Sequence, residues 1–134
     1  MSKPVLEDLF TFSGRRNRKS YNLYQVAMAL IGGVGELIVA SGEVALVVIG
    51  VLVLFALGLS QIAVVTQRFR DFGWTGWTIL VFPGLVLLVV LAFSFDWGIG
   101  LVWLAIAAAF VVTLALMCVP GNRGDNDYGP DPLR

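Results

Sequence analysis

The chain has 134 residues, a formal net charge of zero at pH 7 and a mean hydropathy of +0.87. Apolar residues make up 58% of it and charged residues 13%, whereas a soluble domain has about 45 to 50% apolar and about 25% charged residues. This composition predicts an integral membrane protein of one domain, too short for a separate soluble catalytic module. The zero net charge provides no overall field for nucleic acid, so we expect no nucleic-acid partner.

Two residue counts exclude the common metal and cofactor chemistries. The chain has no histidine and a single cysteine, Cys118, within an apolar run. One thiol excludes an internal disulfide and a thiolate metal cage. The lack of histidine removes haem ligation, most zinc chemistry and the usual neutral-pH proton shuttle. We therefore expect no catalytic residues, no cofactor and no metal.

Four apolar runs are long enough to cross a bilayer, whose hydrocarbon core of about 30 Å requires roughly 20 helical residues. Backbone in lipid must satisfy its own hydrogen bonds and the runs lack strict polar alternation, so they are predicted to be helices rather than barrel strands. Short connections within each pair predict two antiparallel hairpins, and the fold class is all-α. The predicted spans are 21–40, 44–65, 77–95 and 98–119, within a single domain 1–134.

The first predicted span is the least apolar of the four and contains one carboxylate, Glu36. An intramembrane carboxylate is by default a candidate functional group. Glu36 follows Tyr21 by 15 residues, so it lies about 22 Å along a helix, toward the outer face rather than at mid-bilayer. This depth favours solvation at the outer rim, beside Glu43, over a role inside the membrane.

The polar stretch TQRFRDFGWTGW occupies residues 66–77, which are the predicted central loop 66–76 and the first residue of the third predicted span. Trp74 and Trp77 are predicted to be interfacial anchors, because tryptophan favours the headgroup region. Arg68 and Arg70 offset the dipole at the end of the second helix, and Asp71 is within helical pairing distance of Arg68. These structural reasons suffice for the stretch, and we favour them over a chemical role.

All nine basic residues lie on one side of this four-helix arrangement. The opposite side receives Glu43 and Asp96, so the positive-inside rule predicts that both termini and the central loop are cytoplasmic. A three-helix alternative would divide the basic clusters across the membrane, and we reject it for that reason. The basic residues are Lys3, Arg15, Arg16, Arg18, Lys19, Arg68, Arg70, Arg123 and Arg134.

Three blocks of the sequence together resemble a known family. FTFSGRRNRKSYNLY at 10–24, QRFRDFGWTGW at 67–77 and PGNRGDNDYGPDP at 120–132 look like its N-terminal motif, its central motif and its C-terminal tail. The family is the YhaH-like group of small bacterial inner-membrane proteins, domain of unknown function 805. The resemblance implies a multi-pass protein of the bacterial inner membrane and no assigned activity. Gln67 and Arg70 stand where the family has arginine and histidine, so no proton-transfer role of that histidine carries over.

The four-helix arrangement brings these three blocks to one membrane face. The N-terminal segment 1–20, the central loop and the tail 120–134 are therefore predicted to form a cytoplasmic polar cap. Arginine forks suit carboxylates and phosphates, and a rigid Pro-Asp-Pro segment can fold the tail back over the loop, so we favour a docked tail over a frayed one. The candidate cap residues are Arg15, Arg18, Arg68, Arg70, Asp71, Asn126, Tyr128 and Asp131.

Three functional classes remain open on this basis. The first is a non-enzymatic accessory or scaffold subunit, whose partners are the lipid bilayer and other membrane proteins or further copies of itself. The second is a small transporter or a binder of an anionic solute or lipid headgroup that uses the arginine cap. The third is an enzyme acting on headgroups or prenyl phosphates, which is least favoured because the cap offers only Asp71 and tail aspartates as base or metal ligand. We expect the first class.

Overall fold

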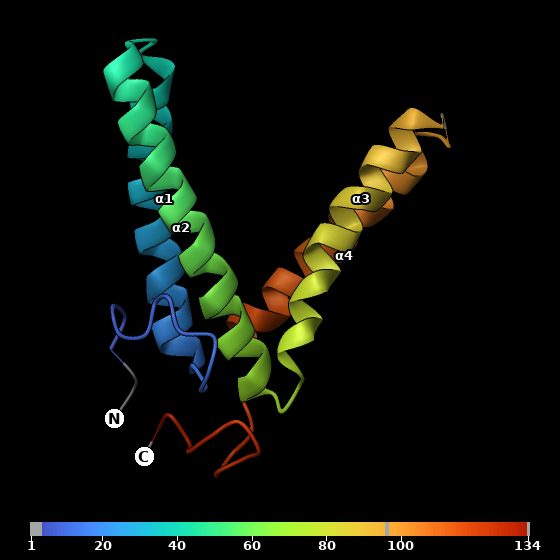
Figure 1. Cartoon of the computed structure of the whole chain (residues 1–134). Coiled ribbons are helices and arrows are strands. Elements are labelled where there is room, and N and C mark those ends of the chain that lie inside the picture. The colour runs from blue at the N-terminus through green and yellow to red at the C-terminus, as the bar shows by residue number, and fades with distance from the viewer. Residues whose placement is uncertain (1–3, 96, 134) are drawn as a thin grey trace.

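The structure is a computed structural model and describes residues 4–95 and 97–133. Within those residues the chain is helical, and the one β-type pairing is an isolated bridge between Asn126 and Gly129 in the tail. The predicted connection residue Asp96 and the terminal cations Lys3 and Arg134 lie outside the described residues. The elements are α1 (Arg18–Ala40), α2 (Val44–Asp71), the 3-10 helix η1 (Gly76–Leu80), α3 (Val81–Ser94) and α4 (Ile99–Cys118) (Figure 1).

Four helical segments are long and apolar enough to cross a membrane, with η1 and α3 together forming the third. The predicted all-α membrane fold is confirmed. Many large apolar side chains on these helices are exposed, among them Leu37 on α1 and Phe110 on α4. A soluble protein would bury such residues, whereas lipid is as apolar as leucine and removes the need to do so. The helices therefore lie in the lipid bilayer.

At the polar end, the first two helices extend beyond the predicted spans. Residues 66–71, predicted as loop, are the last turns of α2, and the connection to η1 is residues 72–75. The helix continues because the side chains of 63–69 are buried against neighbouring segments rather than lying at the water boundary. α1 begins at Arg18 because the side chain of Asn17 accepts a hydrogen bond from the amide of Ser20, which caps the helix.

The four helices form two pairs that diverge from a common base (Figure 1). α1 lies along α2, and α3 lies along α4. Two glycines allow the first pair to approach closely, because a Cβ on Gly35 would be 3.0 Å from Leu54 and one on Gly50 would be 2.7 Å from Val39. The pairs meet at the base, where α2 contacts η1 and α1 contacts α4.

The largest buried cluster lies at this base, whereas along the α3–α4 pair the buried residues are few and small, such as Ala92 and Ala105. The cluster at the base joins α1, α2 and α4. Both chain termini lie at the same end of the molecule (Figure 1), so the N-terminal segment and the tail cover the cluster from the polar side. The base is therefore the part of the protein with a packed interior. The cluster consists of Tyr21, Tyr24, Val64, Val65, Phe69 and Leu116.

Candidate functional site

One carboxylate, Asp71 at the end of α2, is shared by two arginines at the centre of the base. Arg68 Nη1 donates to Asp71 Oδ2 at 2.5 Å, and Arg15 Nη2 lies 3.0 Å from Oδ1. All three side chains are at most 3% exposed. Charge-assisted bonds between guanidinium and carboxylate are among the strongest hydrogen bonds in proteins. Asp71 therefore ties the N-terminal segment to α2.

Arg68 also closes the end of α4. Its Nε donates to the carbonyl of Leu116 at 2.8 Å, and its Nη2 donates to the carbonyl of Val119 at 2.5 Å. These carbonyls belong to the last turn of α4 and the residue that follows it, where a helix has no partners of its own for its C=O groups. Because Arg68 is on α2, its fork joins the two helix pairs at the base.

Arg15 holds the tail against the same carboxylate. Its Nη2 donates to the carbonyl of Asn122 and its Nη1 to that of Gly124, both at 2.6 Å. The amide of Asn122 donates to the backbone carbonyl of Asp71 at 2.7 Å. The tail is consequently docked on the base rather than frayed. We call the group formed by Arg15, Arg16, Gln67, Arg68 and Asp71 the arginine clamp.

Two members of the arginine clamp, Arg16 and Gln67, were missed as site residues by sequence reasoning. Arg16 is fully buried and donates from Nε to Gln67 Oε1 at 3.0 Å and from Nη1 to Ser20 Oγ at 2.7 Å. Gln67 Nε2 in turn donates to the carbonyls of Asp8 and Thr11. Burial lowers the pKa of the Arg16 guanidinium, with nearby Asp8 opposing the shift. The sequence signal for this pair was the doublet Arg15-Arg16. Two adjacent arginines require two partners, and here these are Asp71 for Arg15 and Gln67 for Arg16.

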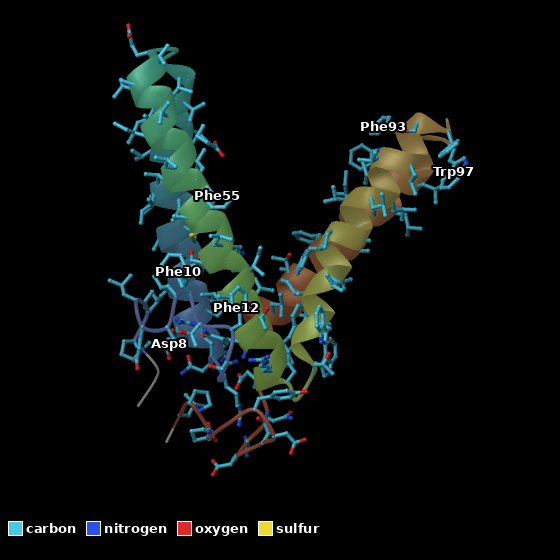
Figure 2. The ribbon with its side chains drawn as sticks, in the orientation of Figure 1. Asp8, Phe10, Phe12, Phe55, Phe93 and Trp97 are labelled. Carbon is cyan, nitrogen blue, oxygen red and sulfur yellow. The ribbon has the colours of Figure 1, made fainter. Side chains whose placement is uncertain are left out.

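The remaining predicted cap residues lie around the arginine clamp, with one exception. Arg70 Nη1 donates to the carbonyl of Phe12, a residue that Figure 2 shows beside α2, and its guanidinium lies 5.5 Å from the Tyr128 ring centroid. Asn126 Nδ2 donates to the carbonyl of Arg70 at 2.9 Å. Asp131 Oδ2 accepts from the amide of Gly124 at 2.9 Å, within the tail.

Arg18, the exception, lies at the edge of the base. It is exposed, and its hydrogen bond to the carbonyl of Cys118 is long, at 3.4 Å. The reason is its position as the first residue of α1, where the side chain projects from the surface beside the end of α4. The structure thus brings together seven of the eight predicted cap residues and leaves Arg18 outside the cluster.

The predicted anchors and the intramembrane carboxylate lie away from the arginine clamp. Trp77 on η1 is 78% exposed, and Trp74 is exposed while its ring stacks on Phe69 at 6.0 Å between centroids. Both tryptophans are near the polar end of the spans. Glu36 is exposed on α1 near the far end of that helix, Ala40, so it takes no part in the polar base.

A second feature is the cleft that begins where the two helix pairs separate. It contains a cavity of about 560 Å³, with walls from α1, α2, η1, α3 and α4. Most of the lining is apolar, as at Phe82 and Pro83, but Gln25 and Gln61 also line it. The Oε1 atom of Gln61 is buried and has no hydrogen-bond partner among the described residues. A buried amide oxygen without a donor is costly, so this atom favours an occupant that carries one.

The arrangement is suited to holding segments together rather than to chemistry. Every guanidinium nitrogen of Arg15, Arg16 and Arg68 donates to a protein oxygen. Asp71 accepts from two of these arginines, so both of its carboxylate oxygens are already engaged in bonds within the protein. The clamp joins four segments that are distant in the sequence: the N-terminal segment, α2, the end of α4 and the tail.

Comparison with known proteins places the sequence in a family. The family model described as "Protein of unknown function (DUF805)" matches residues 9–130. The inner membrane protein YhaI of Escherichia coli strain K12 is 26% identical over 129 residues, which cover 96% of this chain and 91% of that protein. YhaI of Escherichia coli O157:H7 matches with the same values. No solved structure matches. The expected resemblance to the DUF805 family is confirmed, and the relative found carries the name YhaI rather than YhaH.

Proposed function

The chain belongs to the DUF805 family and is a multi-pass inner-membrane protein, and we propose that it acts without catalysis, as a scaffold or accessory subunit for another membrane protein. In this proposal the arginine clamp holds the two helix pairs apart at a fixed angle. The cleft between them receives a transmembrane helix of the partner. The partner helix carries a hydroxyl or amide donor that bonds to Gln61.

The observation that carries the proposal is the cleft. The helix pairs share a packed base but diverge beyond it (Figure 1), and the cavity of about 560 Å³ opens where they separate. Helices associate in membranes through close packing and through hydrogen bonds between polar side chains. The apolar walls of the cavity allow close packing, and Gln61 Oε1, which has no partner among the described residues, can accept an interhelical hydrogen bond.

The alternative, a binder of an anionic solute or headgroup that uses the arginine cap, has less support. Arg15 and Arg68 are buried, and their nitrogens bond to backbone carbonyls and to Asp71. An anion would have to displace these bonds before it could be bound. An enzyme acting on headgroups lacks support for the related reason that Asp71 is held between two arginines.

The proposed partner helix can be detected by crosslinking from inside the cleft. A photoreactive benzoylphenylalanine at Ile62, which lines the cavity, should yield a discrete protein adduct in membranes, whereas the same group at Leu30, exposed on α1, should label lipid. Gln61→Leu should reduce the Ile62 adduct roughly threefold or more, because it removes one interhelical hydrogen bond.

Two results would contradict the partner proposal. Lipid adducts alone at Ile62, as at Leu30, would mean that the cleft is filled by lipid. An adduct of twice the mass of the chain would mean that the occupant is a second copy, and the accessory role for a different protein would be lost. An Ile62 adduct that Gln61→Leu leaves unchanged would also argue against the hydrogen-bonded helix.

We further propose that both termini and the base face the cytoplasm. The described basic residues lie at or beside the base, and the positive-inside rule favours that face for them. In a Cys118→Ala background, Ser41→Cys at the opposite end should react with an impermeant thiol reagent in intact cells. Asp127→Cys in the exposed part of the tail should react only after the membrane is permeabilised. Labelling of Asp127→Cys from outside would reverse the orientation.

A further inference from the structure

We propose that a groove between the start of α1 and the end of α4 binds one anionic phospholipid, whose phosphate group is held by Arg18, Lys19 and Arg123. The groove is distinct from the cleft of the proposed function. It opens beside the polar base. Lipid binding there does not depend on whether a protein partner occupies the cleft. The ligand it fits is a phosphate diester with acyl chains and a hydroxyl-bearing headgroup, such as phosphatidylglycerol.

Two adjoining hollows give the site the shape of a lipid. The first, of about 560 Å³, is lined by Leu23 and Met117 together with Asn22, Cys118 and the two cations Arg18 and Lys19. The second, of about 440 Å³, has the same two cations in its wall, with Arg123 and residues of the tail. Arg18 and Lys19 therefore lie between the first hollow, called the apolar groove for Leu23 and Met117, and the second, called the polar hollow for Arg123 and the tail residues. An acyl chain fits against Leu23 and Met117 in the first hollow. The phosphate fits at Arg18 and Lys19, where the two hollows join, so its headgroup is within reach of both Asn22 on one side and Arg123 on the other.

The three cations are available, in contrast to the arginines of the clamp. Lys19 and Arg123 are exposed, and neither forms an ion pair within residues 4–95 and 97–133. Among the described residues, the Arg18 guanidinium forms one long hydrogen bond, to the carbonyl of Cys118. Basic pockets between transmembrane helices at the polar boundary are known to attract anionic headgroups. The geometry thus separates structural arginines from cations that are open to a ligand.

The carboxylates near the three cations leave the site positive. Asp71 lines the polar hollow, but its charge is balanced by Arg15 and Arg68. Asp131 also lines it and accepts hydrogen bonds from the amides of Gly124 and Leu133. Among the described residues that line the two hollows, three cations face this one remaining carboxylate, so a phosphate monoanion is still attracted.

One uncharged group favours a headgroup that carries a hydroxyl. Asn22 lines the apolar groove beside Arg18 and Lys19. Its Nδ2 donates to the carbonyl of Met117 at 3.2 Å, while its Oδ1 is buried and has no partner among the described residues. The glycerol hydroxyls of phosphatidylglycerol can donate to this oxygen, whereas the quaternary ammonium of phosphatidylcholine has no hydrogen to donate.

The test compares lipids retained by the full-length protein. The protein is purified from mixed micelles of phosphatidylglycerol and phosphatidylcholine in equal amounts, and bound lipids are counted by native mass spectrometry. We expect one phosphatidylglycerol per chain with at least a tenfold preference. Lys19→Gln and Arg123→Gln should each lower the preference roughly fivefold, in line with the contribution of one cation near a lipid surface.

Three controls make the outcome decisive. Lys19→Arg keeps the charge and should keep the preference, and Asp127→Asn changes an exposed charge elsewhere in the tail and should not reduce it. Thermal unfolding of each variant verifies that it folds. Equal retention of the two lipids by the unmutated protein, or an unchanged preference in the Lys19→Gln/Arg123→Gln double variant, would overturn the proposal. Displacement of the lipid by millimolar inorganic phosphate would overturn the choice of a lipid over a free ion.

Discussion

Asp71→Asn is expected to lower the free energy of unfolding by about 3 to 5 kcal/mol, the loss that follows when one partner of a buried ion pair is removed. Asp71 is the carboxylate that faces both Arg15 and Arg68, and all three side chains are buried. Asparagine keeps the volume but leaves two guanidiniums without a counter-charge in an interior where desolvation is costly. The measurement is denaturant or thermal unfolding of the purified protein in mild detergent, together with its amount in the membrane.

Asp127→Asn is the matched control for this prediction. Asp127 belongs to the tail but is exposed, and substitutions at exposed positions usually change stability by less than about 0.5 kcal/mol. An Asp71→Asn protein as stable as Asp127→Asn would mean that the buried ion pairs do not hold the base together. The arginine clamp would then lose its structural role.

Arg68→Lys is expected to release the tail even though the positive charge is kept. The planar fork of Arg68 reaches the carbonyls of Leu116 and Val119 while it bonds to Asp71. A lysine ammonium is a compact point charge and cannot span these three directions. Each buried carbonyl left without a donor costs about 1 to 3 kcal/mol, so we expect tryptic cleavage after Arg123 in the purified protein to become more than tenfold faster.

Arg70→Lys is the comparison that isolates the need for a fork. Arg70 is only partly buried, bonds to the carbonyl of Phe12 and lies over the Tyr128 ring. A lysine can keep both the single bond and the cation–π contact, so cleavage after Arg123 should change by less than about twofold. Equally fast cleavage in the unmutated protein and in Arg68→Lys would show that the tail is not docked in solution.

The site was only partly predictable, and Arg16, Gln67 and Arg18 show why. Arg16 and Arg18 are two residues apart and equally basic in the sequence, yet Arg16 is fully buried and Arg18 is exposed. The difference arises because α1 starts at Arg18, so Arg16 lies in the preceding segment that folds onto Gln67. No local sequence pattern indicates which segments of the chain will contact each other. Gln67 looked like a departure from a family motif, but it supplies the partner that Arg16 requires.

The sequence by itself determined the class of protein and the existence of its four spans. Span length and apolarity are local properties, because a helix in lipid satisfies its backbone within one continuous segment. The all-α fold and the inner-membrane family could therefore be predicted from runs of residues and from three motif blocks.

Only the tertiary structure decided where the polar interactions lie and how the helix pairs are arranged. α2 continues to Asp71 because its last turns are buried by segments from both ends of the chain. The same contacts close the base, while the helix pairs diverge above it (Figure 1). The cavity lined by Gln61 lies where the pairs separate. These features depend on contacts between residues far apart in the sequence, such as Arg15 with Asp71 and Arg68 with Val119. Hydropathy and the order of charges along the chain do not indicate which distant residues will meet. These contacts are decided by the packing of the segments in three dimensions.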